Sequence, residues 1–562
     1  MSPSAHASYF KLTNRGLMLI ISALLSCSCA RIMALEGGPK DTNPPQLITA
    51  YPTEGGTGFK GKVIKLVFDK DIEVRDLYSN LVVTPQLQKL ENKSSYTYNV
   101  RGKTLKLTLK VPLKEATTYT FDFNEAVKDT TEGNIAKGLV LAFSTGDHID
   151  AMYVKGQVKH LTTNQPASKV LVSLYNASST DRDILNSPPD YSTKTDETGK
   201  FKLDHVKKGQ YYIYASTNKG GQQIADPSID EYGFLEEPID LTVTPADHVA
   251  LSILKADVRT FKLQTQQPQD RYFELRFNKP IKDYTLTLKE VSPQPETAPV
   301  LYSHLVDNSQ VIRVYNTFAL SEEESLGAHL HAKDVLGTVI EEDIALRFKK
   351  INAKNSPATY TFLPHSGTAV GATFVGTMTV NKPVREVVAD RLAFFFDSKN
   401  IVHLDRQDIQ LNTQRDKITI RKQLDLDMMQ SKEVLVLQMA EGAFVTVEED
   451  SSQAMHYVYA LKNPKEYGTI KGTVTTKAPG FIVQLLDQEN NVVDSVKNEY
   501  DYQFHGVAPG SYKVRLLVLR EKEGEWSLGN IRKRQAPDPM VFYQGNVAVI
   551  ANWEIEGIDF FF

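Results

Sequence analysis

Apolar and polar residues alternate along most of this chain in short runs. Val63–Phe68, Thr104–Lys110 and Thr118–Phe123 each place an apolar residue at every second position. A period of two is typical of a β-strand with one face in a core and the other in solvent. Such runs recur at short, regular intervals, and long stretches with helical periodicity are scarce. The pattern therefore predicts an all-β protein built of β-sandwiches.

One pair of segments repeats within the chain. Phe201–Ile213 returns as Tyr502–Val514, with Val, Gly and Tyr at the same spacing (V-x-x-G-x-Y). Two shorter agreements precede these segments in the same order, namely Val154–Val158 with Ile470–Val474, and Val172–Leu174 with Val483–Leu485. Gly209 and Gly510 are expected to turn the chain between two strands. The repeat predicts two copies of one sandwich.

A second, shorter repeat occurs three times. Leu66–Ile72, Leu275–Ile281 and Met378–Val384 each combine the end of a strand with Asp or Asn, then Lys, a break and an aliphatic residue. In the second and third copies the break is a proline, which cannot continue a central strand. The motif therefore marks the exit from a strand in three further sandwiches.

The first residues resemble a bacterial lipoprotein leader. Lys11 and Arg15 precede Gly16–Leu25, an apolar stretch that is too short to span a bilayer as a helix but normal for a signal peptide. The sequence Leu24-Leu25-Ser26-Cys27 resembles the lipobox, which implies that Cys27 is lipidated. Cys29 is the runner-up, and an ordinary cleaved signal peptide or a short buried segment is the alternative. An acylated cysteine would attach the chain stably to a membrane.

Further segments carry a resemblance to known families. "GGPKDTNPP" at residues 37–45, "FDKDIEVRDL" at 68–77, "TTYTFDFNEAVKDTTEGN" at 117–134 and "FSTGD" at 143–147 resemble the bacterial Ig-like domain named for S-layer proteins. More closely, they are similar to the N-terminal module of a family of Bacteroidota lipoproteins. The two longer repeats resemble transthyretin-like, or carboxypeptidase-regulatory-like, sandwiches. These resemblances imply an architecture and a cell-envelope location but no specific chemistry.

Together these features predict a tandem array of about five β-sandwich domains, Ig-like and transthyretin-like, after a lipoprotein signal peptide. The expected segments are a signal peptide (1–26), a lipidated cysteine with a flexible tether (27–45), a bacterial Ig-like domain (46–148), a transthyretin-like sandwich (149–256), two Ig-like sandwiches (257–352 and 353–464) and a second transthyretin-like sandwich (465–562).

Charge and motif content limit the function. The formal net charge is −4, from 64 basic and 68 acidic residues, so we expect no nucleic-acid partner. With only two cysteines, both near the leader, the mature chain is not expected to form internal disulfides. Zinc-protease spacings such as H-E-x-x-H, the G-x-S-x-G motif and a Walker loop do not occur in the sequence. We therefore expect no enzymatic activity and no cofactor.

Three places offer weak candidates for a metal site. His329 and His331 would share one strand face, with Asp334 nearby, although a solvated histidine pair on a strand edge is the favoured interpretation. The acids of "ADPSIDEYG" (Asp226, Asp230 and Glu231) lack the spacing of a calcium loop, which favours a charged surface loop. The turn 129–134 is expected to cap backbone groups.

Two tyrosines are candidates for ligand binding. If Tyr211 and Ile213 face the core, Tyr212 and Tyr214 stand on the outer face of the sheet, where their rings could stack on a sugar or peptide. Cross-strand aromatic pairing is the alternative explanation.

The leading hypothesis is a non-enzymatic cell-envelope lipoprotein that acts as a structural or protein-interaction array. Its expected partners are the membrane, through the lipid anchor, and other envelope proteins. In the lipoprotein family that the chain resembles, surface display tends to follow acidic residues just after the lipidated cysteine. The first acidic residue after Cys27 is Glu36, so the resemblance implies the periplasmic side of the outer membrane over the cell surface. A glycan- or peptide-binding lipoprotein that serves an outer-membrane importer is the second hypothesis. An enzyme with a site assembled across domains is the third.

Overall fold

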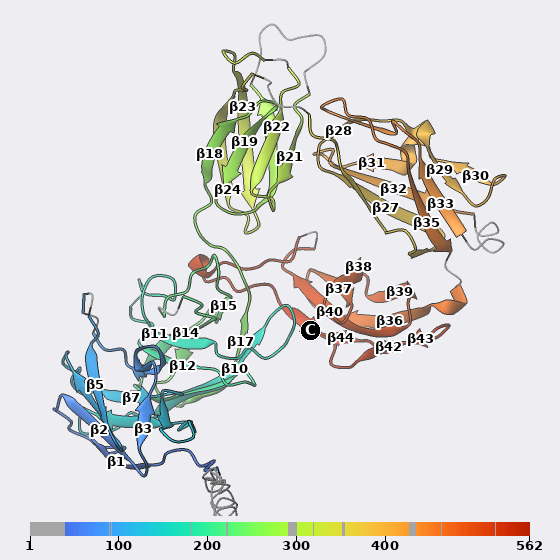
Figure 1. Ribbon diagram of the computed structural model, residues 1–562. Coiled ribbons are helices and arrows are strands. Elements are labelled where there is room, and N and C mark those ends of the chain that lie inside the picture. The colour runs from blue at the N-terminus through green and yellow to red at the C-terminus, as the bar shows by residue number, and fades with distance from the viewer. Residues whose placement is uncertain are drawn as a thin grey trace, which may run out of the picture.

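The computed structural model describes residues 40–562 apart from residues 89, 92, 180, 221–222, 290–299, 319, 351–354, 426–433, 462–463 and 523. Cys27, Cys29, the predicted signal peptide and most of the predicted tether lie outside the described residues. The regular secondary structure of the described part is almost wholly strands, which form separate sheets (Figure 1). The predicted fold class, an all-β tandem array of sandwiches, is confirmed. In this part of the chain, no helix has the length and apolar character needed to cross a membrane.

The first sandwich comprises β1 (Leu47–Tyr51), β2 (Val63–Phe68), β3 (Ile72–Val74), α2 (Leu77–Asn80), β4 (Val82–Thr84), β5 (Tyr96–Arg101), β6 (Thr104–Leu109), β7 (Thr118–Asp122), β8 (Val127–Asp129) and β9 (Val140–Ser144). The sheet β1-β2-β6-β5 and the sheet β4-β7-β9 share one core, and β3 pairs with β8. Ile64, Leu66 and Phe68 of β2 are all buried in that core, as the period of two predicted.

The second sandwich comprises β10 (Met152–His160), β11 (Leu171–Asn176), β12 (Tyr191–Lys194), β13 (Lys200–Val206), β14 (Gln210–Ser216), β15 (Tyr232–Phe234), β16 (Ile239–Asp240) and β17 (Ala246–Ile253). One sheet has the order β13-β10-β17, with β10 and β17 parallel. The facing sheet has the order β12-β11-β14-β15, and β16 also pairs with β14.

The third sandwich comprises β18 (Leu263–Pro268), β19 (Tyr272–Phe277), β20 (Ile281–Leu288), β21 (Ser303–Val306), β22 (Val311–Tyr315), β23 (Leu326–Asp334) and β24 (Val339–Leu346). Its sheets have the orders β18-β19-β22-β21 and β20-β23-β24. Apolar residues from both sheets form its core.

The fourth sandwich comprises β25 (Tyr360–Leu363), β26 (Ala369–Val370), β27 (Thr373–Val380), β28 (Val384–Val387), η1 (Ala389–Arg391), β29 (Leu392–Phe395), β30 (Ile401–His403), η2 (Arg406–Asp408), β31 (Ile409–Leu411), β32 (Lys417–Gln423), β33 (Val434–Met439), β34 (Phe444–Thr446) and β35 (Met455–Leu461). The sheet β25-β27-β32-β31 and the sheet β26-β35-β33-β29-β30 enclose its core, and β28 pairs with β34.

The fifth sandwich comprises η3 (Pro464–Glu466), β36 (Gly468–Thr475), β37 (Gly480–Leu486), β38 (Val492–Lys497), β39 (Asp501–Val507), β40 (Gly510–Leu519), η4 (Ile531–Lys533), β41 (Met540–Phe542), β42 (Val547–Val549), β43 (Glu554–Ile555) and β44 (Phe560–Phe561). One sheet has the order β39-β36-β43, with β44 also on β36. The other has the order β38-β37-β40-β41, with β42 also on β40.

The second and fifth sandwiches share this topology strand for strand. In both, the first strand pairs antiparallel with the fourth and parallel with a strand near the end of the domain. The tyrosine of the repeated motif has the same role in each copy. The Tyr211 hydroxyl donates to the carbonyl oxygen of Lys207 (2.9 Å), and the Tyr512 hydroxyl donates to that of Ala508 (3.0 Å). The V-x-x-G-x-Y spacing therefore reflects a turn that is closed by its own tyrosine.

The Asp or Asn of the shorter repeat also has one role in all three copies. Its side-chain oxygen accepts a hydrogen bond from the backbone N–H directly before the first strand of its sandwich. The donor and acceptor pairs are Gln46 and Asp69 (2.8 Å), Lys262 and Asn278 (2.9 Å), and Thr359 and Asn381 (2.8 Å). The motif thus fixes the point where the chain enters each of these three sandwiches.

The lysine that follows holds the segment leading into the sandwich, and we call this arrangement the linker clamp. Lys70 Nζ donates to Asp41 Oδ2 (2.5 Å) and to the Asn43 carbonyl oxygen (2.9 Å). Lys279 Nζ donates to the carbonyl oxygens of Asp257 (2.9 Å) and Arg259 (2.7 Å). Lys382 Nζ donates to Asn355 Oδ1 (2.6 Å) and to the Ser356 carbonyl oxygen. Lys279 and Lys382 are buried and also form ion pairs with acids of their own sandwich. The clamp makes these entering segments part of the folded domains.

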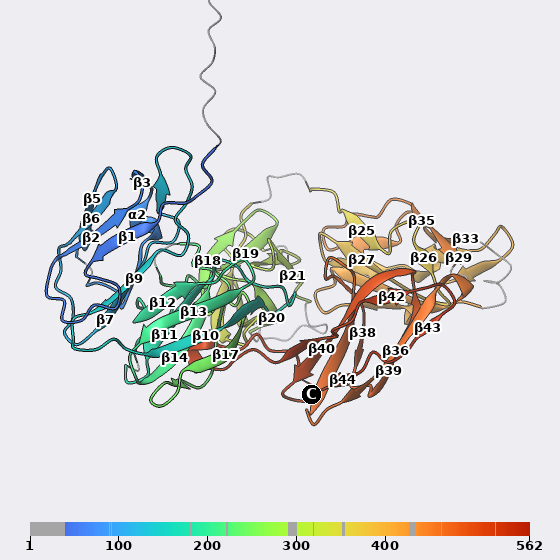
Figure 2. The ribbon, with the colours of Figure 1, turned by 90° about the horizontal axis from the view of Figure 1, so that it is seen from below.

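The five sandwiches do not form a straight rod. In Figure 1 the third sandwich lies above the second and the fourth lies to the right, while the fifth returns to a position beside the second. Figure 2, seen from below, shows the red segment after β40 reaching across to the second sandwich. Segments that are far apart in the sequence are therefore neighbours in space, as the hydrogen bond from Arg515 to Thr162 shows.

Candidate functional site

The two tyrosines predicted to bind a ligand lie where the fifth sandwich meets the second. Tyr211 and Ile213 face the core, and Tyr212 and Tyr214 face the other side of the sheet, as the alternation predicted. That side is not open, however. Tyr214 is only 3% exposed, and the Arg534 guanidinium lies 3.3 Å from the centre of the Tyr212 ring. The segment after β40 therefore covers this face, and the Tyr214 ring lies 6.1 Å from that of Phe234, its cross-strand partner, as the alternative explanation expected.

Apolar residues from three sandwiches meet at this place and form what we call the junction cluster. The second sandwich and the linker after it contribute Tyr175, Ile184, Tyr214, Ala225, Tyr232, Phe234, Ala256 and Val258, the third contributes Leu336, and the fifth contributes Leu528 and Ile531. Ile531 is only 4% exposed. Burial raises the pKa of Tyr214 to about 12, so its hydroxyl stays protonated at neutral pH.

Polar contacts surround the junction cluster. The fifth sandwich donates hydrogen bonds from Arg532 Nε to the Val258 carbonyl oxygen (3.0 Å), from the Ala536 N–H to Glu236 Oε1 (2.7 Å) and from Arg515 Nη1 to the Thr162 carbonyl oxygen (3.1 Å). Two ion pairs, Arg520 with Glu236 and Lys282 with Glu525, also join the fifth sandwich to its neighbours. An apolar centre with a polar rim is the usual organisation of a specific protein interface.

The histidine candidates for a metal site are paired with carboxylates. His329 and His331 lie on one face of β23, and Nδ1 of each contacts a carboxylate directly opposite on β24, at Asp343 (3.0 Å) and Glu341 (3.1 Å). Asp334 lies an odd number of strand positions from both histidines, so its side chain is on the opposite face of β23. There it is buried and pairs with Lys279 Nζ (2.6 Å). Strand parity therefore separates Asp334 from the two histidines. Among the described residues, no group of three or more histidine, cysteine, aspartate or glutamate side chains is placed to hold a metal ion.

The acidic loops use their carboxylates to cap backbone groups. Asp230 is buried and accepts hydrogen bonds from the N–H groups of Lys219 and Asp226 (2.8 Å each). Glu231 instead contacts His160 Nδ1 (2.6 Å). Asp129 accepts from three consecutive N–H groups, those of residues 131–133, which confirms the predicted capping role of this turn.

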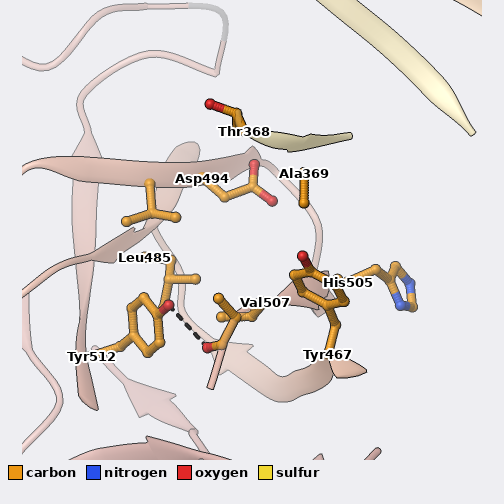
Figure 3. Close-up of a pocket in the computed structure, with 11 residues that line it drawn as sticks. Thr368, Ala369, Tyr467, Leu485, Asp494, His505, Val507 and Tyr512 are labelled. Atoms are coloured by element: carbon orange, nitrogen blue, oxygen red, sulfur yellow. Dashed lines mark hydrogen bonds between the residues drawn. The ribbon is translucent and has the colours of Figure 1, made fainter. Parts of the chain in front are cut away.

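A cavity of about 360 Å³ lies between the fourth and fifth sandwiches. In Figure 3 the Tyr467 hydroxyl and the Asp494 carboxylate point toward Thr368 and Ala369 of the fourth sandwich, whereas the His505 ring points away from them. Asp494 and His505 are therefore not arranged as an acid–base pair. Burial raises the pKa of Tyr467, so its hydroxyl is a hydrogen-bonding group and not a base at neutral pH.

Comparison with known proteins identifies one of these domains. Residues 41–145, which form the first sandwich, match the model of the bacterial Ig-like domain. No curated protein matches the chain. The junction and the cavity involve sandwiches outside the matched span, so the family match does not describe them.

Three solved structures show distant similarity to the chain. The TIE protein of Bacillus anthracis is 10% identical over 97% of this chain and 78% of its own, with a TM-score of 0.13. The S-layer protein rSbsC is 12% identical over 87% of this chain and 65% of its own, with a TM-score of 0.14. The major pilin subunit BcpA of Bacillus cereus is 8% identical over 73% of this chain and 98% of its own, with a TM-score of 0.12. Scores this low carry no argument about function.

Proposed function

We propose that this chain is a non-enzymatic lipoprotein of the cell envelope that holds five β-sandwiches in a fixed arrangement for contact with other envelope proteins. The junction cluster is the observation that carries this proposal. It joins the second, third and fifth sandwiches through one apolar centre, with Ile531 buried among residues far away in sequence. Independent sandwiches on linkers would leave these apolar residues exposed. A fixed arrangement suits a protein that presents several surfaces at set positions.

The leader and the first sandwich support the envelope location. The lipobox-like residues before Cys27 favour a lipid anchor, and the first sandwich matches a bacterial Ig-like domain. Lys70 holds Asp41, which follows Cys27 closely in the sequence. At about 3.5 Å per extended residue, the stretch from Cys27 to Asp41 keeps the first sandwich within roughly 50 Å of the membrane surface. We place the chain on the periplasmic side of the outer membrane.

Metabolic labelling tests the anchor. Cells that express the wild type, Cys27→Ala or Cys29→Ala would be grown with a clickable fatty acid, and the purified protein would be assayed for label. We expect label on the wild type and on Cys29→Ala but not on Cys27→Ala. Label that persists in Cys27→Ala would move the anchor to Cys29, and an unlabelled wild type would refute the lipoprotein assignment.

Site-specific crosslinking tests the partner role. A photoreactive amino acid would replace exposed valines in two sandwiches, Val375 in the fourth and Val493 in the fifth. A protein that organises its neighbours should give discrete crosslinked species in intact cells, and Ile531→Asp, which breaks the junction, should change their pattern. Crosslinks that are absent at both positions, or identical in the Ile531→Asp variant, would contradict a role for the fixed arrangement.

A further inference from the structure

A groove with a volume of about 530 Å³ lies at the boundary between the first and second sandwiches. Its apolar part includes Leu81, Val83 and Leu87 of the first sandwich, all of them buried. Tyr78 and Tyr96 also line it, and Gln223 comes from the second sandwich. We call this feature the tyrosine groove. Its volume lies within the range of ligand-binding pockets, which often occur at domain boundaries.

Tyr78 is held in place, yet one side of its ring remains accessible. Its ring packs on Tyr96, with a centroid distance of 5.4 Å and an interplanar angle of 28°, and lies 5.4 Å from the ring of Tyr98. The Tyr96 hydroxyl donates to the Leu77 carbonyl oxygen (3.2 Å), which fixes the supporting ring. Tyr78 is nevertheless 56% exposed. A supported ring with a free face suits a ligand that has a flat, partly apolar face.

Amides close one side of the groove. Gln86 Nε2 donates to Gln223 Oε1 (2.8 Å), so a hydrogen bond between domains spans the boundary. This bond uses one hydrogen of Gln86 and one lone pair of Gln223. The Gln86 carbonyl and the Gln223 amino group keep hydrogen-bonding capacity for a ligand. Nearby, Ser94 and Ser95 add hydroxyl groups to the lining.

The charge of the lining restricts the ligand further. Among the described lining residues, Lys93 carries the only charge, and no carboxylate is present to attract an amine. Two of these residues belong to strands, Val83 in β4 and Tyr96 in β5, which is too little strand edge to pair with an extended peptide. An aromatic face, neutral amides and hydroxyls are the groups that recognise the C–H face and hydroxyls of a sugar ring.

We propose that the tyrosine groove binds an oligosaccharide that carries no positive charge. One sugar ring stacks on Tyr78, and its hydroxyls bond to the Gln86 and Gln223 amides. This site is separate from the junction cluster. Loss of sugar binding would therefore leave the domain arrangement intact, and opening of the junction would leave the groove in place.

A glycan array with the full chain lacking its leader, labelled with a fluorophore, tests the proposal. The probes are several hundred immobilised neutral and acidic glycans, together with amino-sugar polymers. We expect a related group of neutral or acidic glycans to bind. The strongest soluble hit would then be titrated by calorimetry against the variants described below. Binding to none of the glycans, or only to the cationic polymers, would overturn the proposal.

Matched variants separate stacking from folding. Tyr78→Ala should weaken the affinity at least tenfold, whereas Tyr78→Phe, which keeps the ring, should stay within about threefold of the wild type. Tyr51→Ala is the control, because Tyr51 is 60% exposed on the same sandwich but outside the groove. Gln223→Ala should also weaken binding, which would show that the second sandwich takes part. Equal affinity of Tyr78→Ala and the wild type would overturn the assignment of the site. If the protein binds extended peptides on an array in a Tyr78-dependent way and binds no glycan, the proposal that the ligand is an oligosaccharide would be overturned.

Discussion

Gly156 and Gly472 occupy equivalent positions in the first strands of the second and fifth sandwiches. A Cβ atom on Gly156 would lie 1.9 Å from the Val249 carbonyl oxygen, and one on Gly472 would lie 2.0 Å from that of Ile558. Both carbonyls belong to the chain that follows the repeat and runs beside its first strand. Glycine in the repeated K-G-x-V segment is therefore required by the close approach of two backbones.

Gly156→Ala is expected to destabilise the second sandwich, because the alanine methyl group would clash with backbone atoms of Val249. Backbone atoms cannot move aside as the end of a flexible side chain can. The expected loss of unfolding free energy is about 1–3 kcal/mol, measured by urea denaturation. Gly327→Ala is the control, since its nearest neighbour would be the flexible Lys289 side chain at 3.4 Å. A loss in Gly156→Ala no larger than that of the control would contradict the steric argument.

Lys279 is expected to be the most sensitive lysine of the linker clamp. Its side chain is 1% exposed and pairs with Asp334, which is fully buried. Lys279→Met leaves that carboxylate without its cation, and removal of one partner from a buried pair typically costs about 3–5 kcal/mol. Calorimetric unfolding should show the loss in the third sandwich.

Lys289→Met serves as the comparison for Lys279→Met. The Lys289–Asp343 pair is 51% and 62% exposed, and such surface pairs contribute less than about 1 kcal/mol. If the two variants unfold at the same temperature, the buried pair does not stabilise the domain.

At the scale of elements, the segments that lead into the first, third and fourth sandwiches behave as parts of the fold. The three linker clamps hold residues 41–43, 257–259 and 355–356 by the same lysine of the repeated motif. The segment 257–259 also carries its own ion pair, in which Asp257 binds the Arg259 guanidinium (2.6 Å). Rigid entry into the third and fourth sandwiches reduces the freedom of each relative to the domain before it.

Acid is expected to weaken the segment 257–259. Burial alone would raise the pKa of Asp257, but hydrogen bonds from Arg259 and the charge of Lys279 hold it below its ordinary value. A lowered carboxyl pKa means that the folded state favours the charged form. The stabilisation is therefore complete above about pH 4, the ordinary aspartate pKa, and is lost as the pH falls below it.

Calorimetry of the wild type and Asp257→Asn between pH 3 and pH 7 checks this prediction. Asp257→Asn should melt at a lower temperature than the wild type at pH 7, and the difference should shrink toward pH 3. Asp204→Asn is a suitable control, because the Lys202–Asp204 pair is solvent-exposed. A difference that stays constant over the whole pH range would show that the charge of Asp257 is not responsible.

The sequence predicted strands and repeats well because both depend on local pattern. The alternation in Val63–Phe68 sets which side chains of β2 enter the core, and the V-x-x-G-x-Y spacing sets the Tyr211 turn. The surroundings of Tyr212 and Tyr214 could not be predicted in this way. Their exposure depends on Ile531 and Arg534 near the other end of the chain, and local pattern does not specify which distant segment covers a sheet face.

The tyrosine groove shows the same limit for a binding site. Tyr96 and Tyr98 stand out as alternate residues of one strand, but Tyr78 lies on a one-turn helix and Gln223 on another sandwich. Only the packing of the first sandwich on the second brings these groups together. A motif search cannot find such a site, because its residues have no fixed spacing.

At the scale of the whole molecule, the junction cluster holds the fifth sandwich against the second and third. The covalent linkers alone would allow the fifth sandwich to move away from the second, and the interface is what joins them. Interfaces between domains of one chain resemble transient protein interfaces, so a few buried residues decide whether they hold. Ile531 is buried in the apolar cluster of this interface, whereas the Arg532 side chain and the Ala536 backbone N–H donate hydrogen bonds around it.

Ile531→Asp should therefore open the molecule without unfolding its sandwiches. The substitution removes a buried aliphatic side chain, which costs about 2–5 kcal/mol, and places a carboxylate among apolar residues. Small-angle X-ray scattering should show a larger radius of gyration and a longer maximum dimension. Ile550→Asp is the matched control, because Ile550 belongs to the same sandwich and is 50% exposed. It should scatter like the wild type. If Ile531→Asp also scatters like the wild type while both variants are folded by circular dichroism, the junction cluster does not hold the arrangement, and the polar contacts of the fifth sandwich, such as that of Arg515 with Thr162, must hold it instead.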